Sequence, residues 1–424
     1  MAALLALLCG CAVATSAIDG AVGAAEASEF GAVGDGVTDD TAALQRALNS
    51  GRPVRLGERK TYALSRRLTV PSHGGLIGDG TATLIARAAG FASTDITVRG
   101  RYKADSSVID ASGMVVPPYT PNDGVVLRGF KLRYEWTEGR YLDGIVARNV
   151  QGLLIERVEI SGFPIGSGIK VASVRGGSAI RDNVVRDFSS DTSFAATYAG
   201  AIPQITGIEV DNDRVNGIGT QGLSIARNRI VNLTVGPVMR AAHGYQSDGI
   251  NVASQHADGV AIEGNEISNV GEGIDMFGVR GRILHNVVTD AYVFGIKLIH
   301  GASHNEVAFN RIERAGLAGI VLSGSASASQ GTEHNNVTDN IVADIDPHGV
   351  WAANETACIQ LSDNRATVHK ARRNRFLRNR LDPGHNGKWV VNVRNNSGGN
   401  NDFSGNDIRS DGRRGAISAG DEAR

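Results

Sequence analysis

The sequence predicts an all-β solenoid, a fold in which short strands recur along the chain and stack turn upon turn. One short phrase recurs: Gly, then Ile, then a variable residue, then an apolar residue. Its copies begin at Gly168, Gly207, Gly249, Gly273, Gly295 and Gly319. The last four copies are separated by 24, 22 and 24 residues, and repetition at such a period is typical of solenoids. Within each copy the apolar residues lie two apart, as on the inner side of a strand.

The variable residue of the phrase points away from its apolar neighbours. In five consecutive copies it is Lys170, Glu209, Asn251, Asp275 and Lys297. Because the turns of a solenoid stack, we expect these side chains to form one column on an outer face. A column of polar and charged groups is where we expect the chemistry of the protein.

A second strand pattern alternates with the first and places an asparagine inside a run rich in Ile and Val. Its copies contain Asn183, Asn228, Asn265, Asn286, Asn310 and Asn340. An asparagine at the same point of each turn can bond to the asparagines above and below it. We therefore assign these residues to the scaffold.

The composition bears on the kind of partner, the kind of core and the disulfides that we expect. The 424 residues include 54 Gly and 10 Pro, and the formal net charge is −1. A nucleic-acid partner would require a strongly basic face, so we expect none. Aromatic residues make up 5% of the chain, which predicts an aliphatic core. Beyond the N-terminal segment the chain has a single cysteine, Cys358, so we expect no internal disulfide.

Residues 1–25 are interpreted as a secretory leader. Residues 2–14 form an apolar run that is too short to span a membrane, and small residues at 21–25 offer cleavage sites. We therefore expect a secreted or periplasmic protein with no transmembrane span. A lipoprotein anchor at Cys11, within a Leu-Cys-Gly-Cys stretch, is the alternative.

Residues 26–60 are expected to begin and cap the solenoid. The stretch Phe30–Thr41 is rich in Gly and Asp, and residues 42–49 have the apolar spacing of a short helix. Asp39 and Thr38 are alternative candidates for the N-cap, and Gly51 is expected to end the helix. A solenoid exposes its first apolar layer, so a capping helix has a clear physical role.

This opening segment resembles the entry motif of the pectate-lyase-like domain, which is shared by rhamnogalacturonase-like and epimerase-like proteins and by many phage tailspikes. The resemblance implies a right-handed parallel β-helix, here over residues 61–408, and a polysaccharide ligand. The acidic residues of the motif are interpreted as structural, and residues 409–424 as a polar tail. Insertions at 111–123, 189–206 and 234–247 are expected to form loops beside a groove.

The outer column and its flanking loops supply the candidate site. Candidate catalytic residues are Asp248, Glu272, Asp275, Lys297 and His300, and candidate substrate-binding residues are Arg148, Lys170, Glu209, Tyr245 and Asn251. The leading hypothesis is an exported enzyme that acts on an acidic, uronate-containing polysaccharide by β-elimination or C5-epimerisation. Such chemistry needs a cation for the substrate carboxylate, a base and an acid.

Each role in this hypothesis has candidates. Lys297 is a candidate for the base or for the neutralising cation. The role of base requires that its pKa be lowered. His300 or Tyr245 can transfer the second proton. Lys170 or Arg148 can bind the substrate carboxylate.

Glycoside hydrolysis by two carboxylates is the alternative enzyme hypothesis. The stretches 246–250 and 271–274 resemble the active-site row of polygalacturonase-like β-helix hydrolases. Asp248, Glu272 and Lys297 match that row in position. The Asp-Asp pair of that family is reduced to one acid here, and its Gly-His-Gly is absent.

A third hypothesis is a non-catalytic glycan-binding or surface protein with the same fold. No cofactor is expected, with calcium as the alternative, because Asp211 and Asp213, or the acids of the candidate site, offer oxygen ligands. The histidines show no zinc spacing. The oligomeric state is left open between monomer and trimer.

Overall fold

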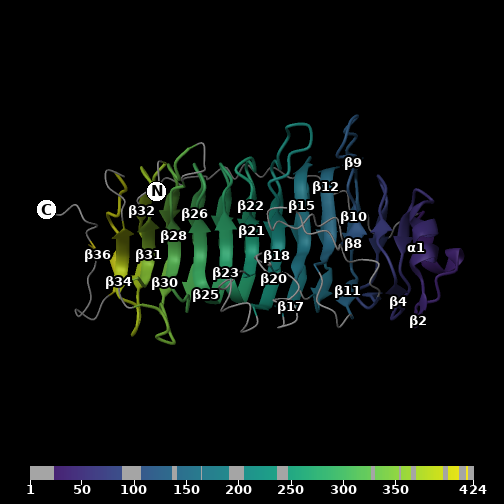
Figure 1. The fold of residues 1–424 in the computed structure, drawn as a ribbon, viewed down its shortest axis with the longest axis horizontal. Helices are drawn as coiled ribbons and strands as arrows, with labels where there is room; N and C mark the ends of the chain where they lie inside the picture. Colours follow the sequence, from purple (N-terminus) through teal and green to yellow (C-terminus); the bar gives the residue numbers. More distant parts are fainter. Residues whose placement is uncertain are drawn as a thin grey trace, which may run out of the picture.

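The computed structural model describes residues 23–87, 107–135, 141–163, 165–190, 205–235, 247–325, 330–352, 355–363, 369–394, 400–409 and 417–418. Short strands wind into a parallel β-helix whose turns stack along one long axis (Figure 1). A complete turn adds one strand to each of three faces, and strands of neighbouring turns pair in parallel. This arrangement confirms the predicted all-β solenoid.

The first face is a 12-stranded sheet of short strands. In spatial order these are β1 (Ala25–Glu26), β3 (Pro53–Arg55), β6 (Gly75–Ile77), β10 (Val126–Arg128), β13 (Leu154–Glu156), β16 (Ala179–Arg181), β19 (Ser224–Ala226), β22 (Ala261–Glu263), β24 (Arg282–Leu284), β26 (Glu306–Ala308), β29 (Asn336–Thr338) and β32 (Arg375–Leu377).

The second and third faces belong to one 24-stranded sheet that bends between them. The second face contains β2 (Asp35–Asp39), β4 (Thr61–Leu64), β7 (Thr83–Ala86), β11 (Lys131–Tyr134), β14 (Glu159–Ser161), β17 (Val184–Ser190), β20 (Arg229–Val235), β27 (Arg311–Glu313), β30 (Ile341–Ala343), β33 (Arg380–Asp382) and β35 (Asp407–Ile408).

The third face contains β5 (Leu68–Thr69), β8 (Ser107–Asp110), β12 (Asp143–Gln151), β15 (Gly166–Arg175), β18 (Ile205–Val210), β21 (Ser247–Val252), β28 (Ala318–Leu322), β31 (Ala357–Ser362), β34 (Trp389–Arg394) and β36 (Ile417–Ser418), and β9 (Asn122–Asp123) pairs with the end of β12. Two long strands, β23 (Glu266–Met276) and β25 (Val287–Leu298), run through the bend and belong to both faces.

The recurring phrase lies on the third face. Its glycine is required at the bend where the chain passes from the second face to the third. A Cβ atom on Gly249 would lie 2.6 Å from the carbonyl oxygen of Gly273 on the next turn and 2.5 Å from Cγ2 of Ile267. No side chain fits at such distances. The phrase therefore needs glycine because the backbone of the next turn approaches closely at this point.

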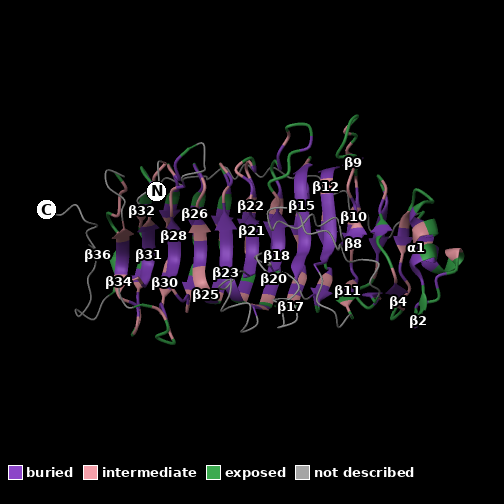
Figure 2. Cartoon of the chain, viewed as in Figure 1, coloured by how far each residue is buried: buried purple, intermediate pink, exposed green. Residues whose placement is uncertain are grey.

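The isoleucine of the phrase forms a stack inside the solenoid. Its members are fully buried register partners on successive turns: Ile145, Ile169, Ile208, Ile250, Ile274, Ile296, Ile320 and Ile359. Burying each such side chain contributes roughly 1.5–3 kcal/mol. Burial follows the strands, whereas exposure is concentrated in the loops (Figure 2). The core is aliphatic, as the composition predicts, and includes Cys358 as a free thiol.

Helix α1 (Thr41–Leu48) covers the N-terminal end of the solenoid beside the 3-10 helix η1 (Ala27–Phe30) (Figure 1). Its side chain Leu44 is fully buried. The acidic residues of the entry motif are structural, as expected. Asp39 accepts a hydrogen bond from the first backbone N–H of α1 at 3.0 Å, and Asp40 accepts two backbone N–H groups of the preceding loop at 2.7 and 3.1 Å.

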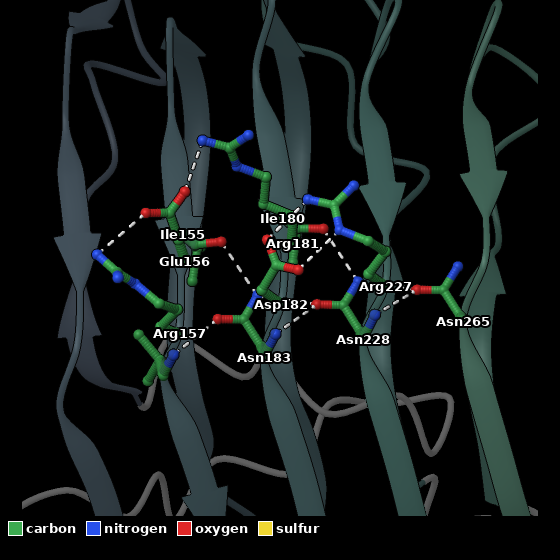
Figure 3. Close-up of polar contacts among 11 residues, drawn as sticks. Ile155, Glu156, Arg157, Ile180, Arg181, Asp182, Asn183, Arg227, Asn228 and Asn265 are labelled. Carbon is green, nitrogen blue, oxygen red and sulfur yellow. Dashed lines mark hydrogen bonds and ion pairs between the residues drawn. The ribbon is translucent and has the colours of Figure 1, made fainter. Parts of the chain in front are cut away.

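The asparagine column lies between the first and second faces, and it is longer than predicted. Asn228 shows the pattern: its Nδ2 donates to the oxygens Ile180 O and Asn265 Oδ1, each at 3.0 Å (Figure 3). Its Oδ1 accepts from the N and Nδ2 of Asn183 at 3.1 and 2.9 Å, so all four bonding positions of the amide are used. This first ladder comprises Asn183, Asn228, Asn265, Asn286, Asn310, Asn340, Asn379 and Asn406.

A second ladder, which was not predicted, lies between the third and first faces. It comprises Asn305, Asn335, Asn374 and Asn401. Each of these residues precedes a member of the first ladder by five positions in the sequence. The repeated pair of asparagines was therefore the signal that predicts both ladders.

Two strands lie in segments that the sequence interpretation assigned elsewhere. Ala25, assigned to the leader, is buried in β1 and pairs with β3. The predicted tail contains β36, which extends the third face. The insertion at 111–123 is a loop that ends in β9. Residues 1–22 and most of the other two insertions, at 191–204 and 236–246, lie outside the described residues.

Candidate functional site

The column predicted from the phrase forms on the third face. The register pairs Lys170 with Glu209, then Glu209 with Asn251, then Asn251 with Asp275, and finally Asp275 with Lys297. We call this set the outer column. These side chains alternate with the inner isoleucines, yet the first four are at most 8% exposed. The predicted alignment is confirmed.

A second column runs beside the first, at the position directly before each glycine, and we call it the bend column. It comprises Asp143, Ser167, Thr206, Asp248, Glu272 and Phe294 on successive turns. The two columns contain buried side-chain atoms without a hydrogen-bond partner, among them Thr206 Oγ1, Asn251 Oδ1 and Asp275 Oδ1. Buried polar atoms are normally paired, so unpaired atoms in these two columns mark them as candidate functional positions.

Three consecutive turns bring five residues together around one ammonium group, and we call them the Lys297 cluster: Asp248, Asn251, Glu272, Asp275 and Lys297. Lys297 Nζ lies 2.8 Å from Asp275 Oδ2 and forms a second ion pair with Glu272. Asn251 Nδ2 donates to Asp248 Oδ2 at 3.0 Å. Three carboxyl groups share one cation, so the cluster carries an excess of negative charge when all of them are ionised.

Burial and charge set the protonation states of the Lys297 cluster. Burial raises the pKa of Asp275 to about 7, with Lys297 lowering it and Glu272 raising it further. Burial opposes the charged form of Lys297, but the carboxylates of Asp275, Glu272 and Asp248 outweigh it and hold the Lys297 pKa above its usual range. Lys297 therefore stays protonated in this arrangement, so the lowered pKa on which the base role depended is not found. Asp275, by contrast, exchanges its proton near neutral pH.

His300 and Phe294 border the cluster. His300 follows the end of β25, where its Nδ1 lies 2.9 Å from Ser325 Oγ and its ring packs edge-on against Phe277. Burial, assisted by the charge of Lys297, lowers the pKa of His300, which keeps its imidazole neutral at pH 7. The ring centroid of Phe294 lies 5.8 Å from Lys297 Nζ. The cluster therefore has an aromatic neighbour and a neutral imidazole at its edge.

A second group of charges lies earlier in the same columns, and we call it the Lys170 cluster. Lys170 Nζ lies 3.2 Å from Glu209 Oε1 and 3.0 Å from Asp211 Oδ2. The Ser167 hydroxyl donates to the other oxygen of Glu209. Burial raises the pKa of Asp143 to about 6, against the opposing charge of Lys170. Lys170 itself lies four turns from Lys297, or roughly 19 Å at the spacing of β-strands.

Known proteins share this architecture. Residues 238–408 match the family described as "Right handed beta helix region". The A-module of mannuronan C-5 epimerase AlgE6 from Azotobacter vinelandii superposes with a TM-score of 0.53 at 15% identity, covering 93% of this chain and 98% of that one. The chain is a right-handed parallel β-helix.

Two further solved structures resemble this β-helix. The surface adhesin PfbA of Streptococcus pneumoniae has a TM-score of 0.55 at 15% identity, with 93% of each chain covered. The tailspike of E. coli bacteriophage HK620, solved with a pentasaccharide, has a TM-score of 0.54 at 13% identity over 88% of this chain and 65% of that one. At such identities the likeness shows the fold alone.

Part of the chain is also similar in sequence to a phage protein. Depolymerase 1 of Klebsiella phage K5-2, described as capsule K30/K69-specific, is 32% identical over 177 residues, which are 39% of this chain and 20% of the phage protein. The chain thus spans about a fifth of the length of this relative. Among the described residues, no helix has the length and hydrophobicity that a membrane crossing requires.

The other predicted site residues of the β-helix are less central. Arg148 lies on β12, with its Nε 3.5 Å from Asp213 Oδ2. Tyr245 lies outside the described residues. The described residues contain no group of three or more His, Cys, Asp and Glu side chains arranged to hold a metal ion. In both clusters an ammonium group neutralises carboxylates that were candidate calcium ligands, which lowers their attraction for a cation.

Ser167 and Phe294 are site residues that the sequence interpretation missed. Each directly precedes the glycine of the phrase, as Asp248 and Glu272 do. That shared position was the available signal. The sequence interpretation used that position only for acidic residues, because neither serine nor phenylalanine resembles a catalytic acid or base.

Proposed function

We propose that this β-helix is a glycoside hydrolase that cleaves a polysaccharide, and that the Lys297 cluster carries its chemistry. The observation behind the proposal is a pair of unlike carboxyl groups on adjacent turns. Burial raises the pKa of Asp275 to about 7, whereas the Asn251 amide holds Asp248 by a hydrogen bond of 3.0 Å. A glycosidase needs one carboxyl group protonated and another ionised at its working pH.

The proposed reaction assigns one role to each charged group. Asp275 donates its proton to the glycosidic oxygen as the bond to the anomeric carbon breaks. Asp248 accepts a proton from the water molecule that adds to that carbon, and two shorter saccharides are released. Lys297 stays protonated and stabilises the Asp275 carboxylate that remains, while Glu272 holds Lys297 in place.

The charge balance favours hydrolysis over β-elimination or epimerisation of a uronate. Those reactions need a cation that is available to the substrate carboxylate. Lys297 and Lys170 each pair with two protein carboxylates, with which a substrate carboxylate would have to compete. An excess of carboxylates also repels an acidic chain. We therefore propose a neutral or weakly acidic polysaccharide as the substrate.

The relationship to a capsule-specific phage depolymerase supports a polysaccharide as the substrate class. Together with the predicted leader, it supports action outside the cell. The Lys170 cluster, with Arg148 beside it, is proposed to bind sugar residues further along the same chain.

A panel of capsular and other bacterial polysaccharides tests the proposal, with new reducing ends as the readout. We expect wild-type protein to release reducing ends from at least one polymer, and Asp275→Asn and Asp248→Asn to lose that activity. Asp339→Asn is the matched control, because Asp339 forms an exposed ion pair with Arg378. Full activity in either cluster variant would disprove the assignment.

A second candidate function is the lyase or epimerase chemistry of the leading sequence hypothesis, and His300 is the residue that favours it. Its neutral imidazole beside Lys297 can accept a proton from C5 of a uronate. The same panel separates the two functions. A lyase produces an unsaturated uronate that absorbs in the near ultraviolet, an epimerase inverts C5 without cleavage, and a hydrolase does neither.

A further inference from the structure

A hollow of about 370 Å³ lies beside the candidate site, within the size range of small-ligand pockets. Its lining comes from β23, β25 and the loops that follow β27 and β30, and includes Asn269, Asp290, Tyr292, Arg314, His348 and Trp351. Two aromatic side chains, one ion pair and several hydrogen-bonding groups therefore meet in one concave surface. None of these residues belongs to the outer column or the bend column.

The hollow is built by specific contacts. The indole Nε1 of Trp351 donates to the carbonyl oxygen of Tyr292 at 3.2 Å. A Cβ atom on Gly316 would collide with both Tyr292 and Trp351, so only glycine permits this approach. The carboxylate of Asp346 accepts the backbone N–H groups of Val350 and Trp351 at 2.9 and 3.3 Å, which fixes the loop that presents the indole. The indole of Trp351 is thus held in a defined position before any ligand binds.

The lining of the hollow carries two carboxylates, Asp290 and Asp346, and one guanidinium, Arg314. Arg314 forms two hydrogen bonds with Asp290, each 2.7 Å long, and both side chains are about two-fifths exposed. Such a pair presents N–H donors and carboxylate acceptors to a ligand without a net charge. Hydroxyl groups suit it better than a carboxylate or phosphate does. Aromatic faces beside hydroxyl-binding groups match a sugar ring, which has C–H groups on its faces and hydroxyl groups around its edge.

The hollow and the Lys297 cluster share two strands. On β23 Asn269 lies three residues before Glu272, and on β25 Tyr292 lies five residues before Lys297, with Phe294 between them. The hollow therefore lies on the same turns as the cluster, just before the bend to the third face. A glycan chain that crosses the cluster and the ring of Phe294 reaches the hollow within a short distance.

We infer that this hollow is a saccharide-binding subsite for a neutral pyranose residue of the polysaccharide. The inference rests on the proposed function for the identity of the polymer, but not for its cleavage. Tyr292 and Trp351 would pack against the sugar ring, and the Asp290–Arg314 pair would bind its hydroxyl groups. The subsite would add affinity for the polymer without taking part in proton transfer.

Affinity electrophoresis of the full chain in gels that contain each polysaccharide of the panel tests the subsite independently of cleavage. We expect Trp351→Ala and Arg314→Gln to weaken retardation by the bound polymer about tenfold, as the loss of roughly 1.4 kcal/mol would. Asp275→Asn is expected to bind as the wild type does. Phe309→Ala is the matched control, because Phe309 is 53% exposed and stacks on His285 away from the hollow.

The outcomes distinguish this inference from the proposed function. If Trp351→Ala and Arg314→Gln bound the polymer normally, the subsite would be overturned and the proposed hydrolysis would stand. The same conclusion would follow if the wild type cleaved a polymer of the panel but bound none of them in the gel. Weakened binding in both variants without any cleavage by the wild type would support the subsite and overturn the hydrolase. Arg314→Gln keeps the inference testable if the Trp351 variant misfolds. Arg314 is partly exposed, so its replacement is expected to leave the unfolding temperature unchanged.

Discussion

The asparagine ladders and the outer column are both stacks of buried polar side chains that repeat once per turn, yet their hydrogen bonding differs. In the first ladder Asn265 makes all four hydrogen bonds of which its amide is capable. In the outer column Asn251 Oδ1 and Asp275 Oδ1 are buried without a partner. A repeated identical residue closes a network on itself, whereas this column of different residues leaves buried polar atoms without a partner.

The difference teaches where stability and function lie in a solenoid. The satisfied ladder has no capacity left for a substrate, so its role is to fix the register of the turns. The outer column holds a carboxyl group whose pKa burial raises to about 7 and a lysine shared by two carboxylates. Such an arrangement is unfavourable for folding and is retained at functional sites.

The largest expected effect comes from Asp275→Asn. We expect kcat to fall about 100- to 10,000-fold, the usual contribution of a general acid, because the amide cannot donate the required proton. The thermal unfolding midpoint should not fall, since the variant removes an unfavourably buried carboxyl group. Activity assays and thermal melts check both parts. A destabilised variant with normal kcat would show that Asp275 serves stability, as the ladder does, and not catalysis.

A ladder variant should behave in the opposite way. Asn335→Ala removes four hydrogen bonds and leaves buried partners on Asn305, Asn374 and Ala302, at a cost of about 3–5 kcal/mol in the free energy of unfolding. Its neighbour Asn336 is exposed, so Asn336→Ala is expected to cost less than about 0.5 kcal/mol. Denaturation curves measure both variants, and equal effects would show that the ladder is not what stabilises this bend.

The pH dependence sharpens the assignment of Asp275. Its folded pKa of about 7 lies above the ordinary value of 3.8, so kcat/KM should fall about tenfold per pH unit above pH 7 as the acid ionises. Between these two values the folded state retains a proton that the unfolded state releases, so the free energy of unfolding contributed by Asp275 decreases as pH rises. Asp275→Asn should flatten that dependence, and an unchanged slope would assign the raised pKa to another group.

The smallest expected effect belongs to the Lys170 cluster. If it binds sugar residues distant from the cleavage point, Lys170→Met should raise KM about threefold to tenfold, equivalent to roughly 1 kcal/mol, and leave kcat within a factor of about two. Steady-state kinetics on the cleaved polymer measure both constants. If Lys170→Met lowered kcat as strongly as Asp275→Asn does, the Lys170 cluster would carry all or part of the chemical step.

The candidate site could be predicted only in part. Asp248, Glu272, Asp275 and Lys297 were identified because the phrase fixes their register, and the structure brings all four together. Their protonation states could not be predicted, because the pKa of Lys297 depends on which carboxylates surround it in space. The hollow beside Trp351 also escaped prediction, since its lining comes from separate turns and carries no repeated pattern.

The sequence by itself determined the solenoid, the outer column and most of the first asparagine ladder, because a regular repeat converts spacing along the chain directly into position in space. The tertiary structure decided what that column can do. Burial and the mutual approach of charges on neighbouring turns keep Lys297 protonated and bring Asp275 close to neutrality. Those energies depend on distance and on exclusion of water, which a linear pattern of residue types does not contain.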